Sequence, residues 1–120
     1  MKTDLSDKLT ILIAAKADSE DRLINLGITL DYINYHFNVP IILSEQDDIP
    51  KLDKICKDKN VKHIFHETTE FFNRQRGVNI CAKNASTPVI AHYDADILLK
   101  PQQIKAAVKA IINNKADLAY

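Results

Sequence analysis

The chain has 120 residues, of which 46% are hydrophobic and 27% are charged, with sixteen basic and sixteen acidic side chains. This length indicates one globular domain, because a domain usually contains about 100 to 200 residues. The balanced charge provides no basic surface of the kind that nucleic-acid binding requires, and it is equally unsuited to an anionic membrane surface.

The sequence also argues against a membrane span and against several cofactor classes. Residues 1–9 are polar and charged, and no apolar run approaches the roughly 20 residues that span a bilayer, so we expect no membrane span and a cytoplasmic protein. Cys56 and Cys81 stand among apolar helix positions, which favours buried reduced thiols over a disulfide. Because Gly27 and Gly77 are the only glycines, the sequence contains neither a dinucleotide-binding turn nor a P-loop.

The first half of the chain alternates between strand and helix patterns. Residues 9–15 form a continuous apolar run, which is typical of a strand covered on both faces. Asp18 is the expected cap of a following helix, whose apolar positions recur at steps of three and four. Residues 39–43 predict a second strand, residues 44–48 a polar loop, and residues 52–56 a short helix. The apolar positions of the first helix are Leu23, Leu26, Leu30, Ile33 and Phe37.

The second half repeats this alternation. Residues 61–65 predict a brief third strand, and Thr69 is the expected cap of a third helix. Residues 89–93 predict a fourth strand, and Pro101 opens a last helix. The terminal residues 116–120 can begin a fifth strand.

This order of elements predicts the fold class. Strands that alternate with helices form a doubly wound α/β fold, with a mostly parallel sheet and helices on both faces. Ligands of such sheets bind beyond the carboxyl ends of the strands. The segments expected there are residues 15–22, 44–48, 66–76 and 94–98.

Two carboxylates directly follow the fourth predicted strand. Asp94 and Asp96 are separated by one small residue, at a point where the chain turns away from the sheet. Carboxylate oxygens suit hard divalent ions such as Mg2+ or Mn2+, which also bind phosphate oxygens. The same pattern occurs in ordinary solvated turns, so the two carboxylates alone leave both interpretations open.

The residues around this pair resemble the GT-A glycosyltransferases, particularly the family-2-like and β4-galactosyltransferase-like enzymes. Phe72-Asn73-Arg74 comes first, followed by Asn79, Ala85, an apolar strand, Asp94-Ala95-Asp96 and Pro101. These elements keep the order and spacing of the family pattern together. The resemblance implies the Rossmann-like, nucleotide-sugar-binding half of a GT-A fold.

The resemblance also implies how the chain is organised. Residues 1–120 are expected to form a single nucleotide-sugar-binding domain, as in a truncated GT-A domain. In similar enzymes the catalytic base comes from a further, acceptor-binding half, so no catalytic residue is assigned and the chain alone is expected to be incomplete as an enzyme. A sheet edge and apolar face left exposed in this way make self-association an expected property.

Transferred position by position, the resemblance assigns five site residues. Asp96 is the expected metal ligand, and Asp94 is expected to contact the ribose or donor sugar and the metal. Arg74 is expected to face the donor phosphates, because its planar guanidinium matches an oxyanion. Glu45 and Asp47 follow the second predicted strand, where the family places an acid against the nucleobase or ribose.

The activity implied by the resemblance is transfer of a hexosyl group from a nucleotide-diphosphate sugar, most simply a UDP-sugar, to a saccharide acceptor. It implies Mn2+ or Mg2+ as cofactor, inversion at the anomeric carbon, and a place in polysaccharide biosynthesis. A non-catalytic nucleotide-sugar-binding or interaction module is the alternative. A phospho-aspartate domain is disfavoured, because its acids would follow the first strand rather than the fourth.

The histidines are interpreted as structural. His63 and His66 lie three residues apart near a strand end, a spacing that gives them no common face for a metal. His92 stands inside the fourth predicted strand and is expected to be packed or hydrogen-bonded.

Overall fold

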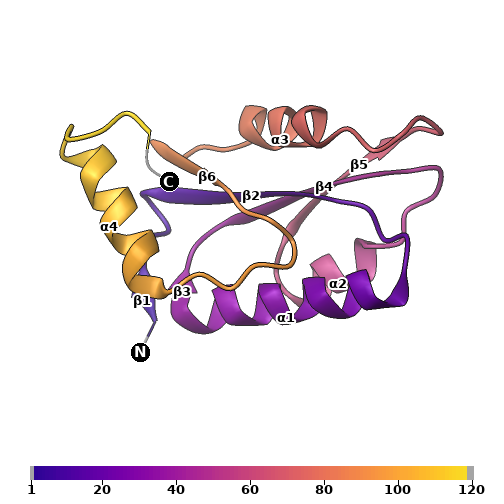
Figure 1. Ribbon diagram of the computed structural model, residues 1–120, viewed down its shortest axis with the longest axis horizontal. Helices are drawn as coiled ribbons and strands as arrows, with labels where there is room; N and C mark the ends of the chain where they lie inside the picture. The colour runs from indigo at the N-terminus through magenta and orange to yellow at the C-terminus, as the bar shows by residue number, and fades with distance from the viewer. Residues whose placement is uncertain (1, 119–120) are drawn as a thin grey trace.

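The computed structural model describes residues 2–118 (Figure 1). Its four-stranded sheet is entirely parallel and has the strand order β5-β4-β2-β6, while β1 and β3 form a separate two-stranded parallel sheet. The predicted doubly wound α/β fold is therefore confirmed. In chain order the elements are β1 (Thr3–Asp4), β2 (Leu9–Ala15), α1 (Glu20–His36), β3 (Phe37–Asn38), β4 (Ile41–Asp47), α2 (Asp53–Asp58), β5 (Lys62–Glu67), α3 (Arg74–Lys83), β6 (Val89–His92) and α4 (Pro101–Ile112).

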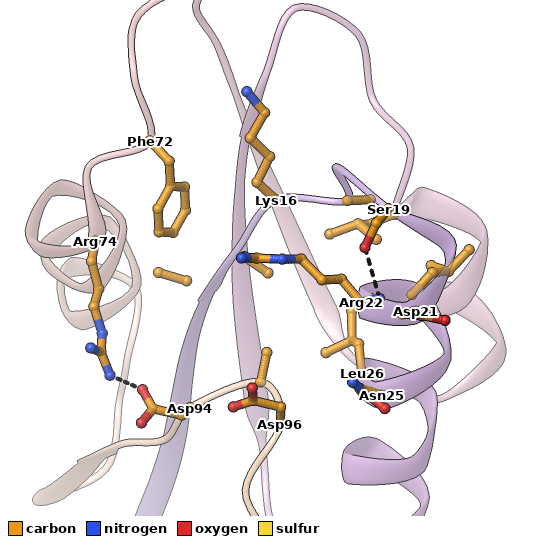
Figure 2. A pocket seen from close by; sticks show the side chains of 16 residues that line it. Lys16, Ser19, Asp21, Arg22, Asn25, Leu26, Phe72, Arg74, Asp94 and Asp96 are labelled. Atoms are coloured by element: carbon orange, nitrogen blue, oxygen red, sulfur yellow. Dashed lines mark hydrogen bonds and ion pairs between the residues drawn. The ribbon is translucent and has the colours of Figure 1, made fainter.

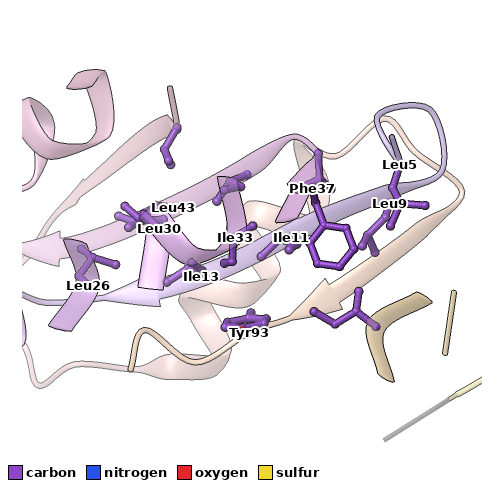
Figure 3. Packing of buried hydrophobic residues seen from close by; sticks show 14 of the residues in the cluster. Leu5, Leu9, Ile11, Ile13, Leu26, Leu30, Ile33, Phe37, Leu43 and Tyr93 are labelled. Carbon is purple, nitrogen blue, oxygen red and sulfur yellow. The ribbon is translucent and has the colours of Figure 1, made fainter. Parts of the chain in front are cut away.

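Helices cover both faces of the sheet. In Figure 1, α1 and α2 lie below the strands and α3 lies above them. Side chains along a strand alternate between the two faces, so Ile11 and Ile13 of β2 join the core between the sheet and α1 while Leu12 packs with Cys81 of α3. Figure 3 shows Leu30 and Ile33 of α1 packed against the larger cluster. Of the apolar positions that predicted this helix, Leu26, Leu30 and Ile33 form its buried face, whereas Leu23 is exposed and Phe37 lies just beyond the helix in β3.

Two predicted helix caps are wrong by one and by four residues. Ser19, not Asp18, caps α1, because its Oγ accepts the Arg22 backbone N–H at 3.2 Å. Asp18 instead forms an exposed ion pair with the Arg22 guanidinium. The cap of α3 is Asn73 rather than Thr69, since the Asn73 Oδ1 accepts the Arg76 N–H at 2.9 Å.

Strand β4 extends beyond the predicted 39–43 run and takes in four polar residues that the sequence placed in a loop. These residues are buried, and three of them have partners that make burial tolerable. The buried polar residues of β4 are Ser44, Glu45, Gln46 and Asp47.

Beyond α4, residues 116–118 form no strand, and residues 119–120 of the predicted fifth strand lie outside the described residues.

The Glu45 carboxylate attaches α2 to the sheet. It accepts the backbone N–H groups of Lys51 and Leu52, at 2.8 and 3.2 Å, immediately before α2 begins. His63 Nε2, on the neighbouring strand β5, lies 2.8 Å from Glu45 Oε1. The buried Glu45 carboxylate thus pairs with two backbone amides that the start of a helix would otherwise leave without partners, and with the His63 ring.

Both cysteines are buried and free, as expected from the sequence. Burial raises the pKa of Cys56 to about 12 and that of Cys81 to about 11. Cys81 Sγ lies 3.7 Å from the Ile13 carbonyl oxygen and 3.5 Å from that of Ile42, so it packs across β2 and β4. Both thiols therefore remain protonated at neutral pH and serve as small core residues.

Among the residues that the structure describes, no helix has the length and apolar character needed to cross a membrane.

The close approach of α3 to the sheet depends on Gly77. A Cβ at this position would lie 2.7 Å from the Ala14 Cβ, 2.9 Å from the Ser44 Oγ and 3.0 Å from the Gln46 Nε2. We predict that Gly77→Ala destabilises the protein by about 1–3 kcal/mol, because α3 must move outward. At Gly27 the nearest atom to an added Cβ is the Ile55 Cδ1 at 3.5 Å. Gly27→Ala should therefore stabilise α1 by up to about 1 kcal/mol. Urea unfolding of both variants measures the difference, and equal effects would contradict the packing argument.

The Glu45 network gives a second prediction. Glu45→Gln places a buried amide N–H against other donors, so we expect a loss of about 1–3 kcal/mol in the free energy of unfolding. Glu67→Gln, at the exposed end of β5, is the matched control and should change stability by less than about 0.5 kcal/mol. Thermal or urea unfolding measures both. A Glu45→Gln protein as stable as the control would show that the carboxylate does not hold α2.

Candidate functional site

A pocket of about 580 Å³ opens at the carboxyl end of the sheet. It lies between the ends of β2 and β6, the first turns of α1 and the segment that enters α3 (Figure 2). Phe72, Leu26 and Leu52 contribute apolar walls. The size falls within the range of small-molecule sites, about 300–1,000 Å³, and the position is where parallel α/β sheets bind ligands.

Charges of both signs line this pocket. Figure 2 shows the Arg22 side chain extending from α1 across the pocket and the Arg74 side chain pointing toward Asp94. Three cationic and three acidic side chains together can bind a ligand that carries phosphates as well as hydroxyl groups. These side chains are Lys16, Arg22, Arg74, Asp21, Asp94 and Asp96.

Arg74 is held by two residues at the end of β6. Its guanidinium forms an ion pair with the Asp94 carboxylate, and its Nε donates to the His92 Nε2 at 3.3 Å. Burial, together with the positive charge of Arg74, lowers the pKa of His92. The imidazole is therefore neutral at pH 7 and can accept the Arg74 N–H. His92 is hydrogen-bonded, as the sequence indicated.

Asp94 and Asp96 both line the pocket, although they differ in their contacts. Asp94 is paired with Arg74, whereas Asp96 is exposed and forms no ion pair with any residue between 2 and 118. Within that same range no group of three or more His, Cys, Asp or Glu side chains could hold a metal. Two carboxylates still fit a Mg2+-like ion, because such an ion commonly uses one or two carboxylates together with substrate phosphates and water.

Two tyrosines fix the segment that carries this acidic pair. The Tyr32 hydroxyl donates to the Leu99 carbonyl oxygen at 2.7 Å, and the Leu99 N–H donates to the Tyr93 hydroxyl oxygen at 3.2 Å. Tyr93 is buried, and burial raises its pKa. The chain after β6 is thus attached to α1, which restricts the turn that contains Asp94 and Asp96.

The other two residues assigned by the resemblance lie elsewhere. Glu45 and Asp47 do not line the pocket, and their side chains occupy the face of β4 toward α2. Glu45 is committed to the network before α2, and the Asp47 carboxylate lies 3.2 Å from the Lys51 Nζ. The structure therefore brings together Arg74, Asp94 and Asp96 and leaves Glu45 and Asp47 apart.

Several pocket residues received no role from the sequence. Lys16 and Asp21 lie in the segment 15–22 that was expected at the strand ends, but nothing in their spacing marked them as pocket residues. Outside the pocket lining, Gln46 also received no role, although its side-chain amide contacts the backbone of Asn73, 27 residues away. No local pattern encodes such a distant contact.

Solved structures with a similar fold include the following two. One is S. aureus TarS, with a TM-score of 0.61 and 16% sequence identity over 90% of this chain and 20% of TarS. The other is a CMP:2-keto-3-deoxy-manno-octonic acid synthetase complexed with CTP, with a TM-score of 0.62 and 10% identity over 91% of this chain and 49% of the synthetase. This chain thus spans about one fifth and about half of the lengths of these two proteins.

No curated protein has a matching sequence. The family model described as glycosyl transferase family 2 matches residues 29–120, which is well over half of the chain and includes Arg74, Asp94 and Asp96. On this match, the chain belongs to glycosyl transferase family 2.

Proposed function

We propose that this chain is the donor-binding part of a metal-dependent glycosyltransferase that uses a nucleotide-diphosphate sugar. The observation that carries the proposal is the convergence of Arg74, Asp94 and Asp96 on one pocket at the carboxyl end of the sheet. Family membership supports the reaction class. The similarity to a synthetase complexed with CTP supports a nucleotide as the ligand of this fold.

In this proposal, the cationic and acidic side chains of the pocket have different roles in donor binding. Arg74 offers a guanidinium to the phosphates, and Lys16 and Arg22 add positive charge to the same pocket. Asp96, together with Asp94, would hold a Mg2+ or Mn2+ ion. When bound, the ion would offset the negative charge of the leaving diphosphate.

The specific reaction that we propose is transfer of a hexosyl group from a UDP-sugar to a saccharide acceptor. Attack by an acceptor hydroxyl on the anomeric carbon would displace UDP and invert that centre. Such a displacement needs a base within hydrogen-bond reach of the hydroxyl. Asp94 and Asp96 are engaged on the donor side in this scheme, so we assign the base to neither.

Metal dependence of nucleotide binding tests the proposal. We predict that UDP binds at least tenfold more tightly with Mn2+ than without it, equivalent to about 1.4 kcal/mol, because the bare carboxylates repel the diphosphate. Isothermal titration calorimetry with UDP, with and without Mn2+, measures this ratio. CDP and GDP in parallel titrations report which nucleobase is preferred. Equal UDP affinity in the two conditions would reject the metal-bridged site.

Matched aspartate variants assign the effect to the pocket. We predict that Asp96→Asn removes most of the Mn2+-dependent gain in UDP affinity, because it removes the exposed carboxylate at the pocket. Asp58→Asn removes the same charge from the exposed end of α2 and should bind UDP with wild-type affinity. The same calorimetry compares the two. If both variants behave alike, Asp96 is not the metal ligand.

A further inference from the structure

The start of α3 is fixed to the sheet by one buried side chain, Gln46 on β4. The Gln46 Nε2 donates to the Asn73 carbonyl oxygen at 2.6 Å, and the Asn73 N–H donates to the Gln46 Oε1 at 3.0 Å. A single amide therefore pairs with both backbone groups of one residue, as a neighbouring strand would. Gln46 is only 1% exposed, so water does not compete for these bonds.

Both backbone groups of Asn73 and its side-chain oxygen are engaged at this point. Besides its two bonds to Gln46, its carbonyl oxygen accepts the Gly77 N–H at 3.2 Å, the first bond within α3. Its side chain accepts the Arg76 N–H. The backbone that leads into α3 is consequently held from the sheet side and from the helix side at once.

Arg74 is the next residue, and it begins α3. Its side chain is long and half exposed, so its direction depends on where its Cα is held and on which acceptors lie within reach. From the Cα position that Asn73 sets, the guanidinium reaches Asp94 and the Nε reaches His92, both at the end of β6. A shift of the helix start would move the guanidinium away from both partners.

We propose that Gln46 is a positioning residue for Arg74, acting through the backbone of Asn73 to aim the guanidinium into the pocket. Its benefit to ligand binding rests on the proposed function, in which Arg74 contacts the diphosphate. Gln46 does not line the pocket. Its effect on binding must therefore depend on Arg74.

A double-mutant cycle tests this dependence. UDP affinity with Mn2+ is measured by calorimetry for wild type, Gln46→Met, Arg74→Gln and the double variant. We expect Gln46→Met to weaken binding about five- to twentyfold, Arg74→Gln at least tenfold, and the double variant to match Arg74→Gln within twofold. If Gln46→Met weakens binding equally with and without Arg74, Gln46 acts on the fold in general and the proposal is overturned.

A control and a second variant separate positioning from loss of structure. Gln75→Met makes the same change on the exposed side of α3, where the Gln75 amide contacts only Asn79 among the described residues, and should bind UDP normally. Should Gln46→Met not remain folded by circular dichroism, Gln46→Asn replaces it in the cycle. Its amide is one methylene too short to reach both backbone groups of Asn73.

A measurement without any nucleotide makes the outcome independent of the proposed function. In wild type and Gln75→Met, the NMR signal of the Arg74 Nε proton should exchange slowly with water, because His92 accepts it. In the Gln46 variant the signal should shift and exchange at least fivefold faster. Unchanged exchange would overturn the positioning role. Absence of UDP binding by the wild type would instead reject the proposed function, while the exchange comparison still decides the role of Gln46.

Discussion

The close contact between α3 and the carboxyl halves of β2 and β4 is the constraint on which the pocket depends. Because Gly77 has no side chain, the helix can approach Ala14, Ser44 and Gln46 closely. This approach brings the Gln46 amide within hydrogen-bond distance of Asn73 at the start of the helix. The position of Arg74, the first residue of α3, is then determined by the packing of α3 against the sheet rather than by contacts at the exposed surface.

The same placement determines the electrostatics of the pocket. The chain has no net charge, yet cations and carboxylates concentrate at one end of its sheet. Pairing with Arg74 offsets the charge of Asp94, so the two acids after β6 can lie close together without an uncompensated repulsion. The pair is partly exposed, and such pairs contribute little to stability. Arg74 and Asp94 are therefore suited to exchange partners when a charged ligand enters.

The sequence predicted the elements well where apolar residues recur periodically and poorly where the buried residues are polar. The apolar run of β2 and the spacing of Leu26, Leu30 and Ile33 in α1 follow directly from which side chains face the core. The end of β4 did not follow, because a polar run such as 44–47 looks like a loop until its partners are known. Those partners lie on α2, β5 and the start of α3, and their proximity is a property of the tertiary fold.

The site shows the same division for a geometric reason. Asp94 and Asp96 could be expected near a ligand pocket because they follow a strand, and α/β folds bind ligands beyond the carboxyl ends of their strands. Arg74 was assigned through the resemblance to the GT-A glycosyltransferases, and it lines the same pocket. Glu45 and Gln46 are adjacent on one strand, so their side chains point to opposite faces of the sheet. Glu45 points toward α2 and Gln46 toward α3, and only the second face leads to Arg74. Choosing between them requires knowing which helix covers which face, and periodicity within a single strand carries no such information.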